Sequence, residues 1–421
     1  MGAATSIGIV GGGQLAWMLA EAARRRGVEL HVQTPGPQDP ALALASSVVQ
    51  ADVRDVAATR ELAGRCSAIS FENEWVDLDG LAALADDGVC FLPSLDALRP
   101  LVCKRSQRDL LQRLNLPSPA WFVLEQVLPV AADSSAQPSE DPSPVAPPPV
   151  PAAPSLPAGF AYPLMAKAAT GGYDGKGTAV LRSDADLEAL LQRVDPAGWI
   201  VEEFVVFEQE LAVVAARDQR GQVECLPIVQ THQHQQVCDW VLAPAEVGHA
   251  VQQAVRNIAA SLLTALDYVG VLAIEFFYGP RGLQINELAP RTHNSGHYSI
   301  EACSLSQFDL QLLSVSGAAL SEPTLLAPGA LMVNLLGFEE RSSEDPASAY
   351  DSRRQQLAAL PDAHLHWYGK AGSSLGRKLG HITLLLRPED PAARLEEAMQ
   401  RLEQVRAIWP LPPASGGEDL S

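Results

Sequence analysis

Basic side chains are scarce in this sequence. Its 421 residues include 30 Lys and Arg against 50 Asp and Glu, which gives a formal net charge of −20. Such an excess of acidic groups repels nucleic acid and anionic membrane surfaces, so we expect neither as a partner. Any anionic substrate must therefore be bound by basic residues gathered in one place.

Long apolar runs and paired cysteines are also missing. No window approaches the roughly 18 consecutive apolar residues of a membrane helix, and no basic segment followed by an apolar stretch indicates a signal peptide. The six cysteines, at positions 66, 90, 103, 225, 238 and 303, include no Cys-x-x-Cys pair, a pattern typical of reduced thiols in a core. We therefore expect a cytoplasmic protein.

The first part of the chain has the pattern of a βα unit. Residues 7–10 form an apolar strand that runs into a glycine-rich turn at 11–13, and apolar residues then recur at helical spacing until Gly27 ends the helix. The amides of such a turn point at an anion. The turn fits the dinucleotide fingerprint formally, but the second strand, at 29–33, is followed by Thr-Pro-Gly instead of an acid for a ribose hydroxyl, so we do not expect a dehydrogenase.

Two more strands, at 47–49 and 68–71, extend the predicted sheet, and the last of them ends at Glu72 and Glu74. The carboxyl ends of parallel strands border the ligand crevice of an open α/β sheet. Helix caps or solvated turns would explain either glutamate equally well. Residues 95–116 are predicted to be helical, with Lys104, Arg105 and Arg108 on a polar face that solvation alone would explain.

A proline-rich segment interrupts the next domain. Residues 129–157 contain ten prolines among Ser, Ala and a few acids, which is too little apolar surface to offset the entropy of ordering. We predict a disordered or polyproline insert. Because it joins a strand at 120–124 to a strand at 162–167, it interrupts a domain instead of separating two.

A glycine-rich segment with a lysine follows the insert. Residues 171–177 contain four glycines and Lys176, and Lys167 ends the preceding strand. This composition suits a mobile loop that covers phosphates with amides and ammonium groups, although a plain glycine-rich hairpin turn would look the same. The spacing is not that of a Walker A loop. Acids at the end of the next strand, at 199–205, could bind an adenine amine or ribose hydroxyls.

The residues at 271–297 are where we expect the chemistry. Two runs of β-branched and aromatic residues flank Gly-Pro-Arg-Gly, which predicts a three-residue loop at 280–282 with a left-handed glycine at its end. In that register Glu275 lies opposite Glu287. Facing carboxylates repel each other, so we expect a Mg²⁺ ion that takes one or two protein carboxylates and completes its shell with water and nucleotide phosphates. From the pair alone, one glutamate could instead face solvent on an edge strand.

The carboxyl-terminal part adds strands at 332–336 and 364–368. They are followed by Lys370, Arg377 and Lys378 among glycines. Three cations near glycines in an acidic protein are typical of a phosphate site, although solvated turn residues share the pattern. A last helix is predicted to begin at Pro391 with Asp390 as its cap.

These motifs together resemble the ATP-grasp superfamily and, within it, the N5-carboxyaminoimidazole ribonucleotide synthase family of purine biosynthesis. The resemblance is carried by GGGQL at 11–15, FENE at 71–74, GGYDGKG at 171–177, NELAPRTHNSGH at 286–297 and YGK at 368–370 with the residues up to His381. It implies an α/β and α+β fold of the ATP-grasp type. Its domains would be a Rossmann-like pre-ATP-grasp domain at 1–96, an ATP-grasp domain at 97–318 with the insert at 129–158 and a lid subdomain at 160–208, a small β-rich domain at 319–410, and a loose tail at 411–421.

The resemblance also implies ligands for each substrate. ATP would be bound by Lys104, Lys167, Gly172, Tyr173, Asp174, Gly175, Lys176, Gly177, Thr178, Glu202, Glu203, Phe204, Val205, Glu210, Gln233, Asn286 and Glu287. Mg²⁺ would be bound by Glu275 and Glu287. Aminoimidazole ribonucleotide would contact Gln14, Glu72, Tyr173, Asp174, Lys370, Arg377 and Lys378. The catalytic residues would be Asp174, Lys176, Arg291 and His293, with Arg291 and His293 facing bicarbonate or the carboxyphosphate formed from it.

The implied enzyme is an ATP-dependent carbon–nitrogen ligase, homodimeric, that carboxylates 5-aminoimidazole ribonucleotide with bicarbonate. The products would be N5-carboxyaminoimidazole ribonucleotide, ADP and phosphate. A formate-dependent transformylase of the same fold and a nucleotide-binding regulator without turnover are the alternatives. Ala168, Ala169, Thr178 and Gln233 depart from the family's pattern, as does the proline-rich insert.

Overall fold

The computed structural model describes residues 6–128, 154–171, 177–339, 348, 350–370 and 372–413. The chain divides into two compact units, one formed by Met1–Ser118 with Phe207–Ser421 and the other by Pro119–Val206. Most of the proline-rich insert and the centre of the glycine-rich loop lie outside the described residues. In the described part, no helix is both long and apolar enough to cross a membrane. None of the six cysteines forms a disulfide within the described residues.

The larger unit begins with a parallel sheet, as the sequence predicts. Its strand order is β3-β2-β1-β4. The strands are β1 Ser6–Val10, β2 Glu29–Thr34, β3 Ser47–Gln50 and β4 Ala68–Phe71, and the helices are α1 Gln14–Arg26, α2 Val56–Ala63 and α3 Leu78–Asp86. The predicted stop of α1 is confirmed, because Gly27 takes the left-handed conformation with φ of 68° and its amide bonds back to α1.

The prediction of one helical stretch over residues 95–116 is wrong. The chain instead forms α4 Leu95–Leu98, a short 3₁₀ segment Arg99–Leu101, and α5 Lys104–Arg113. Pro100 cannot donate a backbone hydrogen bond, and Cys103 is extended, so no continuous helix forms. α5 therefore begins at Lys104, and its direction is set independently of α4.

A second, nine-stranded sheet forms most of the larger unit. Its order is β14-β13-β9-β11-β12-β15-β17-β16, with β10 paired to β9. The strands are β9 Gln209–Arg217, β10 Val223–Cys225, β11 Val229–His234, β12 Val237–Ala243, β13 Gly270–Gly279, β14 Gly282–Ala289, β15 Gly329–Leu336, β16 Ala363–Trp367 and β17 Lys378–Leu386. The three carboxyl-terminal strands thus continue the sheet that contains the acidic hairpin.

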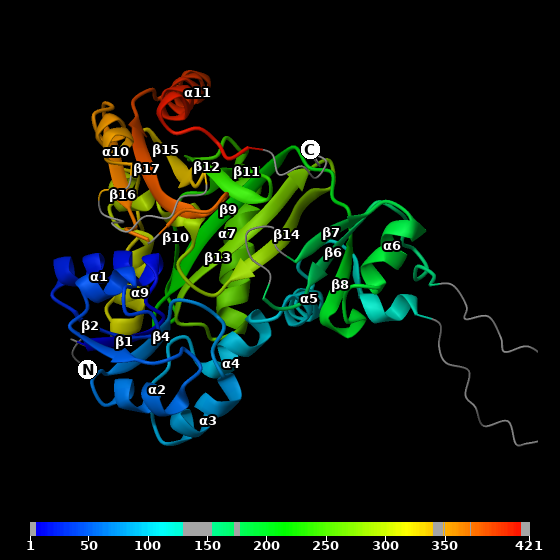
Figure 1. Ribbon diagram of the computed structural model, residues 1–421, viewed down its shortest axis with the longest axis horizontal. Helices are drawn as coiled ribbons and strands as arrows, with labels where there is room; N and C mark the ends of the chain where they lie inside the picture. The colour runs from blue at the N-terminus through cyan, green and yellow to red at the C-terminus, as the bar shows by residue number, and fades with distance from the viewer. Residues whose placement is uncertain are drawn as a thin grey trace, which may run out of the picture. The chain divides into compact units, whose positions relative to one another are not determined.

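Helices cover this sheet and connect it to the parallel one. They are α7 His249–Ala265, α8 Ser299–Ala302, α9 Gln307–Ser316, α10 Asp351–Ala358 and α11 Pro391–Ile408. α9 packs against β13, β9, β1 and α1, as Figure 1 shows. The predicted cap of α11 is confirmed, since the Asp390 carboxylate accepts a hydrogen bond from the amide of Ala393.

The loop of the β13–β14 hairpin is shorter than predicted. Gly279 pairs with Gly282, so the loop contains two residues, Pro280 and Arg281, and the prediction of a three-residue loop is wrong. The left-handed glycine is confirmed, because Gly282 has φ of 81°. It joins the ladder as the first residue of β14.

The predicted pairing of Glu275 with Glu287 is nevertheless confirmed. Phe276 pairs with Ile285, so Asn286 is an extra residue between the two pairs, and the register shifts there. This bulge compensates for the shorter loop. Without it, Glu275 would lie opposite Asn286.

The smaller unit is built on a four-stranded antiparallel sheet with the order β5-β8-β6-β7. Its elements are β5 Trp121–Val123, β6 Leu164–Ala168, β7 Thr178–Leu181, α6 Asp184–Leu191 and β8 Trp199–Glu203. Phe122, Leu164, Leu187 and Val201 are part of its core. The strand predicted at 199–205 ends at Glu203, so Phe204 and Val205 follow it.

Candidate active site

The two carboxylates of the hairpin are partly buried and lie in an acidic environment. Burial and then the neighbouring charges of Glu287 and Glu210 raise the pKa of Glu275 to about 8, while Lys104 and Lys378 oppose the shift. Glu210 lies on the same face of the sheet, because it pairs with Phe277, two residues from Glu275 on β13. Glu275, Glu287 and Glu210 therefore place three carboxyl groups on one face of the sheet.

The carboxylate oxygens of Glu275 and Glu287 are ligands of the kind that a hard cation binds. Lys104 Nζ, from the start of α5, donates to Glu287 Oε1 at 2.6 Å, and His293 Nε2 lies 3.7 Å from Glu275 Oε1. Within the described ranges, no group of three or more His, Cys, Asp or Glu side chains forms a complete metal site. Two carboxylates alone match Mg²⁺, which binds few protein ligands and takes the rest from water and phosphates.

The two other predicted nucleotide ligands of the sheet lie along the same face. Thr231 pairs with Glu210, and Gln233 is two residues further along β11. Alternate residues of a strand share a face, so Glu210 and Gln233 line the surface next to the carboxylate pair. Asn286 is the bulged residue beside Glu287.

Arg291 is held in an ion pair from the parallel sheet. Its Nε donates to Glu74 Oε2 at 2.9 Å, and its Nη1 donates to the carbonyl of Thr292 at 3.2 Å. Burial alone would lower the pKa of Arg291, but Glu74, with smaller contributions from other carboxylates, raises it above its usual value. The guanidinium is therefore a fixed positive charge close to the hairpin.

The anion at the start of α1 comes from the chain itself. The Glu72 carboxylate lies against the glycine turn, and the amides of Gly13, Leu15 and Ala16 favour its charged form. A Cβ at Gly11 or Gly13 would lie within 2.6 Å of its oxygens, so only glycine allows this approach. Burial raises the pKa of Glu72, and these amides oppose the shift.

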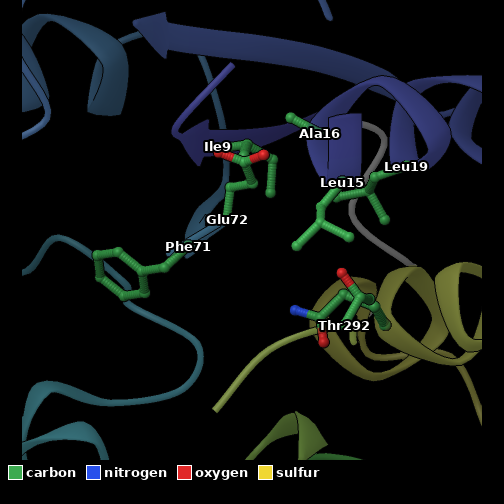
Figure 2. A pocket seen from close by; sticks show the side chains of 8 residues that line it. Ile9, Leu15, Ala16, Leu19, Phe71, Glu72 and Thr292 are labelled. Atoms are coloured by element: carbon green, nitrogen blue, oxygen red, sulfur yellow. The ribbon is translucent and has the colours of Figure 1, made fainter. Parts of the chain in front are cut away.

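A small cavity lies beside this carboxylate. Figure 2 shows the side chains around it, among them Leu15, Glu72 and Thr292. Gln14 begins α1 between Gly13 and Leu15, whose amides favour the charged form of Glu72. Gln14 and Glu72, both predicted to contact the ribonucleotide, are therefore brought together at one end of the parallel sheet.

The backbone around His293 is fixed by a side chain that the sequence did not point to. Gln307 is fully buried at the start of α9, accepts from the amide of His293 at 2.8 Å and donates to its carbonyl at 2.8 Å. Its amide nitrogen also lies 2.9 Å from His297 Nδ1. The capping box formed by Ser306 and Asp309 fixes the start of α9 and thereby this glutamine.

A reciprocal amide pair attaches the same turn to β15. Asn294 donates to Asn334 Oδ1 at 2.9 Å, and Asn334 donates to Asn294 Oδ1 at 2.7 Å and to the carbonyl of Cys238 at 2.9 Å. Both side chains are buried. Because polar groups without partners are costly in a core, this pair determines how the turn sits on the sheet.

We expect Asn334→Leu to lower the free energy of unfolding by about 3 kcal/mol, because the buried amide of Asn294 and the carbonyl of Cys238 lose their partners. Chemical denaturation monitored by circular dichroism measures this change. Met332→Leu, in the same buried strand, is the control and should cost less than about 1.5 kcal/mol. A loss below about 1 kcal/mol in Asn334→Leu would show that the amide pair is not a main determinant of stability.

The three predicted phosphate-binding cations lie around the β16–β17 hairpin. Tyr368 donates its amide to the carbonyl of Leu379, which brings the segment after β16 next to the start of β17. Lys370 Nζ lies 5.4 Å from the ring centroid of Tyr368, and Arg377 donates to the carbonyl of Gly372 at 3.5 Å. Lys378 begins β17 and acts on Glu275 electrostatically, so it lies near the acidic hairpin.

The smaller unit contains the other predicted ATP ligands. Lys167 Nζ lies 2.7 Å from Glu202 Oε2, and both side chains are largely buried. Glu203 accepts from the amide of Ala120 at 3.2 Å, and Thr178 pairs with Lys167 next to Gly177. The predicted loop residues Gly172, Tyr173, Asp174, Gly175 and Lys176 lie outside the described residues.

Comparison with known proteins agrees with the motifs. Three family models match: the ribonucleotide synthetase preATP-grasp domain at residues 4–100, the ATP-grasp domain at 152–308 and the phosphoribosylaminoimidazole carboxylase C-terminal domain at 330–394. The N5-carboxyaminoimidazole ribonucleotide synthase of Synechococcus elongatus is 48% identical over 406 residues, which cover 96% of either chain. The Bacillus subtilis synthase is 32% identical and covers 91% of this chain and 92% of its own. The chain belongs to the N5-carboxyaminoimidazole ribonucleotide synthase family.

Solved structures of the synthase family have the same fold. A Staphylococcus aureus N5-carboxyaminoimidazole synthetase complexed with ADP is 25% identical, with a TM-score of 0.79 over 96% of this chain and 98% of that one. An Aspergillus clavatus synthase in complex with ADP and 5-aminoimidazole ribonucleotide is 26% identical, with a TM-score of 0.78 over 97% of this chain and 100% of that one. The predicted ATP-grasp fold, with a pre-ATP-grasp domain and a carboxyl-terminal domain, is confirmed.

Some of the residues that shape this site could be found from the sequence and others could not. The sequence pointed to Glu275, Glu287 and Arg291, but it did not indicate Gln107, Gln307 or Asn334. Gln307 and Asn334 lie in elements that are mostly apolar, which is a signal that could have identified them, since a buried amide side chain must find partners. Gln107 lies in the polar helix α5, where its sequence neighbours give no such signal.

Proposed function

We propose that this protein catalyses the ATP-dependent carboxylation of 5-aminoimidazole ribonucleotide with bicarbonate. The products are N5-carboxyaminoimidazole ribonucleotide, ADP and phosphate. The observation that carries the proposal is the in-register pair of Glu275 and Glu287 next to Lys104, in a chain 48% identical to a synthase of this name. Two facing carboxylates cost stability unless a cation uses them.

We propose the following ligands for the metal ion and the nucleotide. Glu275 and Glu287 would bind Mg²⁺, and the ion would supply charge that stabilises the phosphates of ATP during transfer. Lys104, Lys167 and Lys176 would bind the phosphates, while Glu202, Glu203, Phe204, Val205 and Glu210 would bind the nucleoside. Gln233, Asn286 and the loop residues Gly172, Gly175, Gly177 and Thr178 would complete this site.

In the first proposed step, an oxygen of bicarbonate attacks the γ-phosphorus of ATP, and the bond to ADP breaks. Carboxyphosphate and ADP result. Arg291 would orient the bicarbonate, because Glu74 already fixes its guanidinium beside the hairpin. His293 would contact the same ligand, since Gln307 fixes its backbone.

In the second step, the exocyclic amine of the ribonucleotide takes the carboxyl group, either from carboxyphosphate directly or from CO₂ that it releases, and phosphate departs. Asp174 or His293 would accept the proton that the amine loses. Gln14, Glu72 and Tyr173 would hold the base and sugar, and Lys370, Arg377 and Lys378 would bind the phosphate. We propose a homodimer in the cytoplasm for this enzyme.

Coupled measurement of ADP release tests the proposal. We expect ADP formation that requires both bicarbonate and 5-aminoimidazole ribonucleotide. A dependence on formate in place of bicarbonate would instead indicate a transformylase of the same fold. Nucleotide binding without any ADP release would indicate a regulator and contradict the proposed activity.

A further inference from the structure

We propose that Gln107 is a positioning residue for this site: by pairing with the backbone of Leu288 it keeps Glu287 on the same face of the hairpin as Glu275. The inference rests on the proposed function for its role in turnover. Its structural part concerns the chain's own residues and can be tested by nucleotide binding alone.

β14 is the edge strand of the nine-stranded sheet, so no strand among the described residues pairs with the outer side of its backbone. Gln107 takes the place of that strand. Its Oε1 accepts from the amide of Leu288 at 3.2 Å, and its Nε2 donates to the carbonyl of Leu288 at 2.9 Å and to that of Leu101 at 2.7 Å. The side chain is 6% exposed, so water does not replace these bonds.

The neighbours of Gln107 on α5 act on the same edge. Arg108 donates to the carbonyl of Asn286 at 2.6 Å, and Lys104 donates to the carboxylate of Glu287 at 2.6 Å. Positions three and four apart share one face of a helix, so Lys104, Gln107 and Arg108 face the strand together. This face, which has the composition of a solvated helix surface, is in fact the partner of β14.

These contacts lie beside the bulge at Asn286, where the register of the hairpin shifts. Phe276 pairs with Ile285, and the shift at Asn286 is what brings Glu275 opposite Glu287. If the pairing continued without the shift, Asn286 would lie opposite Glu275. Because alternate residues point to opposite faces, Glu287 would then point to the side of Ile274, which is core.

Gln107 therefore favours the bulged register, since it binds Leu288 only where the bulge places it. A displaced carboxylate would leave Mg²⁺ with one ligand in place of two. Misplacement of a reacting group by about 1 Å can cost about 100-fold in rate. The expected defect is thus in the metal-dependent part of nucleotide binding and in turnover, beyond the loss of stability.

The test compares Gln107→Met with Gln33→Met in the full-length protein. Gln33 is the matched control: it is fully buried in β2, donates to the carbonyls of Asp52 and Asp55, and accepts from the hydroxyl of Thr59. Calorimetry with ADP, with and without Mg²⁺, measures binding. In Gln107→Met we expect the gain in affinity due to Mg²⁺ to fall at least about tenfold, with Mg²⁺-free binding within about threefold of wild type. Gln33→Met should keep the full gain.

Turnover supplies a second readout in the Glu287→Gln background. We expect Gln107→Met to lower kcat about 100-fold in the wild-type protein and less than about threefold in Glu287→Gln, because the two residues act through one carboxylate. Hydrogen exchange should show faster exchange of the Leu288 amide in Gln107→Met only.

An unchanged Mg²⁺ effect on ADP binding in Gln107→Met, or the same loss in Gln33→Met, would overturn the inference. An equal loss of kcat with and without Glu287 would also overturn it. If wild-type protein releases no ADP with bicarbonate and aminoimidazole ribonucleotide, the proposed reaction fails, but the ADP binding comparison still decides the role of Gln107.

Discussion

Glu287→Gln should lower kcat for ADP formation by about 1,000-fold while the fold remains intact. The substitution keeps the size of the side chain and removes one of the two carboxylates available to Mg²⁺. A loss of about 4 kcal/mol of charge stabilisation in the transition state corresponds to this factor. The coupled ADP assay at saturating ATP measures the change.

The free energy of unfolding of Glu287→Gln shows whether the loss of turnover is due to unfolding. Glu287→Gln relieves the repulsion from Glu275 but also weakens the partly exposed ion pair with Lys104, so the free energy of unfolding without Mg²⁺ should change by less than about 1 kcal/mol. Glu224→Gln, on β10 outside the proposed site, serves as the control and should retain wild-type turnover. Near-normal turnover of Glu287→Gln would rule out the metal assignment.

The second large effect that we expect is a pH dependence of Mg²⁺ binding. Without metal, the pKa of Glu275 is raised to about 8 by burial and then by Glu287 and Glu210. The carboxyl group must lose its proton before it can bind a cation. Affinity for Mg²⁺–ADP should therefore rise about tenfold per pH unit up to about pH 8 and level off above it.

The stability of the metal-free protein should change with pH in the opposite direction to the Mg²⁺–ADP affinity. Between the ordinary pKa of 4.5 and the raised value of about 8, the folded protein keeps a proton on Glu275 that the unfolded chain has lost. The folded state then binds more protons, so metal-free stability falls as pH rises through this range. Denaturation in EDTA at several pH values measures the slope, and Glu275→Gln should remove this part of it.

Binding of ADP without Mg²⁺ is the control for the pH titration, since Glu275 would not then exchange its proton for a metal. An affinity for Mg²⁺–ADP that does not change between about pH 6 and 8 would contradict the raised pKa. It would mean that Lys104 and Lys378, which oppose the shift, outweigh burial.

The local sequence pattern was sufficient to predict most helices and strands and the facing pair of glutamates. The parallel strands, the stop of α1 at Gly27 and the cap of α11 at Asp390 each depend on residues close in sequence. The facing pair of Glu275 and Glu287 was also predicted, but from a loop one residue too long. The pairing holds because a bulge at Asn286 compensates, and no local signal identifies that bulge.

The supports of the site could not be predicted because they join distant parts of the chain. Gln107 and Leu288 are 181 positions apart, and Asn294 and Asn334 are 40 apart. The polar face of α5 was predicted to be solvated for the same reason, because its partner β14 is distant in the sequence. Polar side chains of this kind take their role from the backbone groups that the fold leaves exposed, not from their own neighbours.

The order of the large sheet also bears on how far the chain can be shortened. β12 pairs with β15, so a protein ending after residue 318 would leave β12 as an open edge along its backbone. Open edges recruit strands from other molecules. Such a truncated protein would lose Lys378 and tend to self-associate, which means that the last quarter of the chain is needed for solubility as much as for the site.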